Sequence, residues 1–208
     1  MRRRTLKAAA VCGTAGPALF AAVLVVLTFL EKDFMHSLGW NPLTAVTRDW
    51  PSGLALGPFG FVMTAAFVAG GLALAFLAFG LWQAFQKSRI AGAASILLAF
   101  AGLAMSLLAF STDPTSSRAL PTLHGRVHDA AFAVFGAALS GSLVMFGVVF
   151  QAEAGPRART VLSWITAALI VPSFLIKGIT FYFFLALYMA WCETAGVMLL
   201  RRAGMTPT

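Results

Sequence analysis

Long apolar segments separated by polar breaks make up most of this chain. The six segments span residues 8–30, 58–83, 91–111, 125–150, 160–176 and 180–200. Each is close to the roughly 20 residues that a helix needs to cross about 30 Å of hydrocarbon. The period-2 alternation of barrel strands is missing, and lipid admits only helices and closed barrels because backbone polar groups must be paired there. The pattern therefore predicts an all-α fold, a polytopic transmembrane bundle of six helices.

The polar breaks indicate how these helices connect. The first break, at about residues 31–57, is long and carries Pro42 and Pro51, which predicts an ordered outer loop or a half-inserted element. The other breaks are short, so neighbouring helices are expected to pack antiparallel. We expect residues 1–208 to form a single six-helix transmembrane domain.

Composition agrees with a membrane protein, and the positions of the charges set its orientation. Hydrophobic residues make up 60% of the chain and charged residues 11%, too few polar groups for a soluble domain of this size. Ten of the fifteen Lys and Arg lie on one side of the predicted membrane: Arg2, Arg3, Arg4, Lys7, Lys87, Arg89, Arg157, Arg159, Arg201 and Arg202. Because positively charged loops stay in the cytoplasm, both termini are expected to be cytoplasmic. Topology accounts for the formal charge of +8, so no nucleic-acid partner is expected.

All three histidines lie in or beside polar breaks on the opposite, outer side. His124 and His128 are four residues apart at the start of the fourth segment, on one face of the expected helix. Guanidinium groups nearby match the geometry of phosphate and carboxylate, which favours a membrane lipid as the partner. The expected headgroup pocket contains His124, His128, Asp113, Arg118, Arg126, Asp129, His36 and Arg48.

A metal site is an alternative interpretation of the same residues. His124 and His128 form a two-point clamp to which Asp113 or His36 adds a third ligand, leaving one position for water as catalytic zinc sites require. The pair lacks the intervening glutamate of the zinc-protease motif. Hydrogen bonds from the imidazoles to Asp129, Asp113 or loop carbonyls explain the histidines without a metal. Haem is disfavoured because residues four apart on one helix cannot reach opposite faces of one iron, so zinc is the candidate cofactor.

Two ionisable residues lie within or between the last two segments. Glu193 lies eight residues before Arg201, about 12 Å along a helix axis. Such a group is costly in lipid and usually faces the bundle interior, so we expect Glu193 to bind a neighbouring Ser, Thr or Trp, with a proton or substrate relay as the alternative. Lys177 lies in the narrow break before the last segment and is expected to snorkel outward.

An aromatic cluster begins the last segment at Phe181, Tyr182, Phe183 and Phe184. Aromatic side chains gather at membrane interfaces because their rings lie at the level of the headgroups. We interpret the cluster first as an interfacial anchor and second as a wall for an acyl chain.

Two motifs carry a resemblance to a known family. The segment Phe110-Ser-Thr-Asp113, followed by Thr122-Leu-His-Gly-Arg-Val-His128, resembles the domain-of-unknown-function 998 (DUF998) family of six-span prokaryotic membrane proteins. The likeness covers nearly the whole chain and includes Gly13, Gly16 and Pro17 of the first span and Asp113, His124, Gly125 and His128 of the outer motif. The first outer loop departs from the family, with Thr44 to Arg48 where a Ser-Glu pair is expected. The resemblance implies a multi-pass protein of the prokaryotic plasma (inner) membrane and supplies no substrate.

Three functional hypotheses remain open at this point. The first is an integral membrane protein whose outward-facing His/Asp/Arg pocket binds a lipid headgroup or other amphiphile, as an accessory protein. The second is a metal-dependent intramembrane hydrolase of a lipid ester or amide. The third is a structural subunit of a membrane complex, with a protein partner or a second copy of the chain docked on it.

Overall fold

The computed structural model describes residues 2–39, 51–114, 120–153, 155–176 and 179–205, and each regular element in these ranges is helical. The elements are α1 (Arg2–Leu30), α2 (Lys32–Ser37), the 3-10 helix η1 (Pro51–Leu56), α3 (Gly60–Ala84), α4 (Arg89–Leu107), α5 (Leu123–Ala152), α6 (Arg157–Ile176) and α7 (Ile179–Met205). Each expected segment coincides with one long helix, so the all-α class is confirmed. The long first break contains the two short helices α2 and η1.

Five of the helices, α1, α3, α4, α5 and α7, are long and apolar enough to cross a membrane. The chain is therefore an integral membrane protein with several apolar helices. Helix α6 forms where the fifth segment was expected but is not among these five. The count of six crossings therefore stays a prediction.

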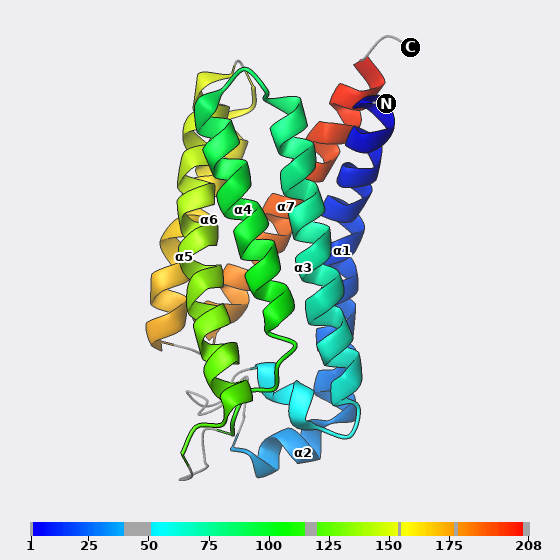
Figure 1. The fold of residues 1–208 in the computed structure, drawn as a ribbon, viewed down its shortest axis with the longest axis vertical. Helices are drawn as coiled ribbons and strands as arrows, with labels where there is room; N and C mark the ends of the chain where they lie inside the picture. The colour runs from blue at the N-terminus through cyan, green and yellow to red at the C-terminus, as the bar shows by residue number, and fades with distance from the viewer. Residues whose placement is uncertain (1, 40–50, 115–119, 154, 177–178, 206–208) are drawn as a thin grey trace.

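The long helices pack in chain order as a closed bundle. Helix α3 packs on α1 and α4, α5 packs on α4 and α6, and α7 packs on α6 and returns to α1. Figure 1 shows both chain ends at one end of the bundle with the α3–α4 and α5–α6 turns, and we call this the terminal end. The opposite end, the loop end, carries α2, η1 and the α4–α5 connection. Helices α6 and α7 meet well short of the loop end (Figure 1), so the first turns of α7 lie inside the depth of the bundle.

A close contact between α3 and α4 depends on two glycines. A Cβ atom at Gly102 would lie 2.5 Å from the carbonyl oxygen of Gly71 and 2.7 Å from the amide nitrogen of Ala75. The Ser106 hydroxyl lies beside this contact, 3.2 Å from the carbonyl oxygen of Gly102 on its own helix and 3.4 Å from that of Val68 on α3. Lipid provides no hydrophobic drive between helices, so small residues that let backbones approach supply much of their attraction. Gly71 and Gly102 therefore set the spacing of α3 and α4.

Arg202 joins three helices at the terminal end. Its guanidinium donates to the carboxylate of Glu153, which follows α5, and at 3.0 Å to the carbonyl of Ala84, the last residue of α3. The guanidinium carbon also lies 4.2 Å from the ring centroid of Phe85. The Ala84 carbonyl is one of the acceptors that a helix end leaves without an internal partner. The contacts of Arg202 thus tie the end of α7 to the ends of α3 and α5.

We expect Gly102→Ala to lower the stability of the bundle. The added methyl must displace backbone atoms of Gly71 and Ala75, and overpacking of this kind costs about 1–3 kcal/mol. The matched control is Gly92→Ala on the same helix, where an added Cβ meets nothing within 4 Å. That change should be neutral or stabilise by up to about 1 kcal/mol, because alanine is the better helix former. Thermal unfolding in detergent micelles measures both, and equal midpoints would show that this contact does not constrain the bundle.

Candidate functional site

Asp113 fixes the connection between α4 and α5. Its Oδ2 accepts the backbone N–H of Thr122 at 2.8 Å, and its Oδ1 accepts the Thr122 hydroxyl at 2.7 Å. Thr122 is the N-cap of α5, and its Oγ1 accepts the N–H of Gly125 at 3.0 Å. A Cβ atom at position 125 would overlap the Asp113 carboxylate, so any larger residue there must displace that carboxylate from Thr122. These three residues of the outer motif therefore hold the start of α5 in place.

The buried imidazole of His128 closes the same connection from inside. His128 is 4% exposed, and its Nδ1 lies 2.8 Å from the carbonyl oxygen of Phe110 and 3.2 Å from that of Leu108. Carbonyl oxygens only accept hydrogen bonds, so we assign the proton of the neutral ring to Nδ1. Both carbonyls belong to the end of α4, where the helix supplies no donor. Hydrogen bonds to carbonyls are the metal-free alternative that the sequence left open.

The other predicted residues of the outer motif lie on the surface. His124 is exposed one turn outward from His128, with its ring edge-on to Phe110 at 5.7 Å between centroids. Arg126 and Asp129 are exposed on α5. The motif therefore has one part that fixes the backbone, through Asp113, Thr122 and His128, and another part whose side chains are exposed on α5.

The remaining predicted residues are divided between α2 and segments outside the described ranges. His36 is exposed in the last turn of α2, also at the loop end (Figure 1). Arg48, Arg118 and Lys177 lie outside the described residues, so the roles assigned to them stay predictions.

The described residues do not assemble the metal site considered above. In that part of the chain, no three His, Cys, Asp or Glu side chains are grouped so that they are able to hold a metal ion. Both oxygens of Asp113 already accept from Thr122, and His128 Nδ1 faces two carbonyls. The geometry therefore gives no support to zinc bound by His124, His128 and Asp113.

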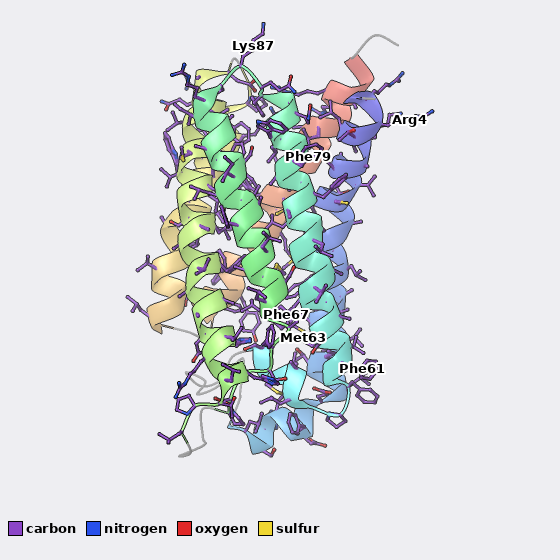
Figure 2. The ribbon with its side chains drawn as sticks, in the orientation of Figure 1. Arg4, Phe61, Met63, Phe67, Phe79 and Lys87 are labelled. Atoms are coloured by element: carbon purple, nitrogen blue, oxygen red, sulfur yellow. The ribbon has the colours of Figure 1, made fainter. Side chains whose placement is uncertain are left out.

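An apolar cavity of about 60 Å³ lies inside the bundle beside His128. Its walls come from α1, η1, α3, α4, α5 and α7, and six of the lining residues are phenylalanines: Phe20, Phe67, Phe132, Phe135, Phe181 and Phe184. Figure 2 shows Met63 and Phe67 near the loop end, where both side chains line the cavity, whereas Phe61 points away from the bundle. Few polar groups reach it. One lining residue, Tyr188, carries a hydroxyl that lies 4.0 Å from the weakly accepting sulfur of Met105 and also hydrogen-bonds with the Cys192 thiol.

The aromatic cluster at the start of α7 divides between this cavity and the outer surface. Phe181 and Phe184 line the cavity, and Phe184 is only 1% exposed. Phe183 is 59% exposed on the outside of the bundle. The second interpretation, a wall for an apolar chain, therefore fits Phe181 and Phe184. Phe183 belongs to the first turns of α7, short of the loop end (Figure 1), so the anchor interpretation stays a prediction.

Glu31 is a buried acid at the loop end, and its burial was not predicted from the sequence. It is 2% exposed, and its Oε1 accepts the backbone N–H of Phe59 at 2.6 Å, directly before α3. Its Oε2 is also buried and has no hydrogen-bond partner among the described residues. In the sequence, the one feature that distinguishes Glu31 is its position directly after the first apolar segment. An acid at that position is usually solvated, so burial was not expected. The long-range contact with Phe59 could not be read from that position.

The expectation for Glu193 is wrong. Its side chain is exposed on the outer surface of α7, not hydrogen-bonded inside the bundle. The neighbouring donors bond elsewhere: Thr194 donates to the carbonyl of Ala190, and Trp191 donates to the hydroxyl of Ser163 at 2.8 Å. The helical phase of α7 puts Cys192 and Trp191 on the buried side and Glu193 on the opposite side.

Comparison with known proteins identifies the family. The family model described as "Protein of unknown function (DUF998)" matches residues 14–200, which is most of the chain, and the chain belongs to this family. The resemblance seen in the outer motif is thereby confirmed. Comparisons with curated proteins and with solved structures find no match.

We expect Asp113→Ala to destabilise the protein. The change removes the acceptor of two exposed hydrogen bonds from Thr122, and a hydrogen bond that water is able to replace contributes about 0.5–1.5 kcal/mol net. The matched control is Asp129→Ala, because Asp129 is exposed on the same helix and such surface changes stay within about 0.5 kcal/mol. Thermal unfolding in micelles compares the two, and a loss of similar size in both would remove the special role given to Asp113.

We expect Glu31→Ala to weaken the start of α3. Without the carboxylate, the N–H of Phe59 loses its acceptor in a partly buried site, at a cost of about 1 kcal/mol. Glu31→Gln keeps a side-chain acceptor and should lose less. Hydrogen exchange at the Phe59 amide reports the contact directly, and Asp33→Ala, which removes an exposed acid two residues away, should leave that exchange rate unchanged. Unchanged exchange in Glu31→Ala would contradict this assignment.

Proposed function

We propose that this member of the DUF998 family is a multi-pass protein of the prokaryotic plasma membrane that binds a membrane amphiphile from the outer leaflet. Part of the amphiphile's apolar tail occupies the cavity beside His128, and its polar headgroup contacts the exposed side chains of the loop end. The observation that carries the proposal is the aromatic-lined cavity inside the bundle.

The charge distribution supports the orientation that the proposal needs. The ten cations named above belong to the first turns of α1, to the α3–α4 and α5–α6 turns and to the end of α7, which all lie at the terminal end (Figure 1). Figure 2 shows Arg4 and Lys87 there. Segments rich in Lys and Arg stay in the cytoplasm, so we place the terminal end inside and the loop end outside.

The positions of the chain ends support six crossings. Both ends lie at the terminal end (Figure 1), which requires an even number of crossings and hence one more than the five helices selected by length and apolar composition. Helix α6 has 20 residues, about 30 Å of helix, which equals the thickness of the hydrocarbon core. We therefore count α6 as the sixth crossing, with both termini in the cytoplasm.

The cavity suits an apolar chain better than water or a polar ligand. Its volume of about 60 Å³ exceeds the roughly 10–15 Å³ that one water needs, yet apolar walls leave water with too few hydrogen-bond partners. Cavities lined in this way stay dry and bind apolar molecules. The volume admits a short stretch of an alkyl or isoprenoid chain, so most of the amphiphile must remain in the membrane.

The exposed part of the outer motif is placed to meet a headgroup. His124 lies one helical turn, about 5.4 Å, outward from the cavity residue His128. Arg126 and Asp129 are exposed on the same helix turns, and His36 is exposed on α2. A hydrogen-bonding side chain at His124, outward of an apolar cavity, matches the order of polar and apolar parts in a membrane amphiphile.

A second candidate function, a subunit of a membrane complex, is supported by Glu193. An acid exposed on the lipid-facing side of an apolar membrane-spanning helix is costly unless another chain covers it. A partner helix with a donor at that depth removes the cost. The two candidates are compatible, since Glu193 and the cavity lie on different sides of α7.

Narrowing the cavity tests the proposed function. Leu24→Phe on α1 and Leu185→Phe on α7 each add ring atoms to the cavity wall, whereas the control Leu19→Phe adds the same atoms to a leucine that is 56% exposed to lipid. The probe is radiolabelled palmitate, titrated into folded, delipidated protein in micelles. We expect the palmitate affinity of the cavity variants to fall about fivefold and that of the control to match wild type. A fivefold loss corresponds to about 1 kcal/mol of binding free energy, the amount lost when about one methylene of the alkyl chain is no longer buried. Equal binding by all variants would contradict the proposal.

Native mass spectrometry of wild type and of Glu193→Leu tests whether the protein is a subunit of a membrane complex. A second copy or another chain that is retained by wild type and lost in Glu193→Leu supports the subunit role. A single chain in both samples contradicts it.

A further inference from the structure

We propose that the terminal end binds an anionic phospholipid of its own leaflet, in a groove between the α3–α4 turn and the ends of α5 and α7. The groove has a volume of about 490 Å³ and is separate from the cavity beside His128. It is lined by 11 residues, of which Lys87, Ser88, Ile90, Val148, Glu153 and Arg202 carry the argument.

The lining changes from polar to apolar along the direction a lipid adopts. Lys87 and Ser88 lie at the tip of the bundle, and Figure 2 shows Lys87 projecting beyond the α3–α4 turn. Below them, Ile90 and Val148 are 44% and 41% exposed on the sides of α4 and α5 that face hydrocarbon. A phosphate at the tip would therefore place its acyl chains against apolar side chains.

Charge in the groove selects an anion. Two cations, Lys87 and Arg202, face one acid, Glu153, and Arg202 is held in place by Glu153 and by the carbonyl of Ala84. Lys87 is exposed at the tip and reaches the interface on its flexible stem. One net positive charge remains in the groove, at the end of the bundle that collects ten of the fifteen Lys and Arg. Basic pockets between membrane helices bind anionic headgroups on this principle.

Ser88 adds a hydrogen-bond donor to the same tip. Its hydroxyl oxygen accepts the N–H of Ala91 at 3.2 Å as the N-cap of α4, which leaves the hydroxyl hydrogen to donate. A phosphate ester offers acceptors to both the ammonium of Lys87 and this hydroxyl. The phosphate of a phospholipid binds these groups while its acyl chains contact the apolar wall of the groove. A soluble phosphate has no acyl chains and so lacks the second contact.

The test compares charge and position. Delipidated protein in phosphatidylcholine micelles is titrated with phosphatidylglycerol, and bound lipid is counted by native mass spectrometry. Lys87→Glu should weaken phosphatidylglycerol binding by about fivefold or more, the contribution expected of one cation near a lipid surface. The control Arg4→Glu makes the same charge change at the same end of the bundle on α1 and should stay within about twofold of wild type.

A second variant tests the apolar wall without a charge change. Val148→Trp obstructs the groove at an exposed position and should also reduce phosphatidylglycerol binding, while the cavity variant Leu24→Phe should not. Equal losses in Lys87→Glu and Arg4→Glu, no preference for phosphatidylglycerol over phosphatidylcholine, or full competition by inorganic phosphate would each overturn the proposal. Because palmitate binding in the cavity is measured separately, failure of either proposal leaves the other intact.

Discussion

The carbonyl groups at the end of α4 need hydrogen-bond donors inside the bundle, and the loop end depends on how that need is met. Helix α4 tightens into i to i+3 hydrogen bonds through Leu108, Ala109 and Phe110 before the chain leaves it. The carbonyls of Leu108 and Phe110 then face the ring nitrogen of His128 on α5. An unpaired carbonyl in a buried site costs free energy comparable to a lost hydrogen bond. A single imidazole thus pairs these carbonyls, anchors α5 to α4 and forms part of the cavity wall.

The acids of the loop end accept hydrogen bonds from N–H groups at the starts of helices, whereas His128 donates to carbonyls at the end of a helix. Glu31 accepts the N–H of Phe59 before α3, and Asp113 accepts the N–H of Thr122 at the start of α5. The first N–H groups of a helix have no internal acceptor, and the helix dipole favours a negative charge beside them. Both helices run from the loop end to the terminal end (Figure 1), so both need acceptors there. What looked from the sequence like a chemically active outer face is partly a set of caps.

The sequence predicted the parts of this structure that follow from one-dimensional periodicity. Span boundaries agree with the helices within a few residues because a helix in lipid must be apolar for its whole length. The pairing of Asp113 with Thr122 was not predicted, because residues nine apart across a turn meet only through the geometry of the loop. His128 and His124 share a helix face, yet His128 is buried and His124, the second residue of α5, is exposed. The prediction that Glu193 faces the bundle interior was wrong for a related reason. The sequence of a mostly apolar helix gives little indication of which side packs against its neighbours.

The cavity lies where α6 and α7 meet, short of the loop end (Figure 1). Because these helices meet before the loop end (Figure 1), the first turns of α7 face the centre of the bundle at the depth of His128. The cavity then borders side chains of α1, α3, α4 and α5, which continue further outward. Aromatic rings from α5 and α7 pack edge to face there, as Phe135 and Tyr188 do at 6.1 Å between centroids. Rigid rings of this kind leave gaps that a flexible chain fills better than another ring does. The position of the α6–α7 connection, short of the loop end (Figure 1), therefore leaves a place for an apolar chain beneath a capped polar surface.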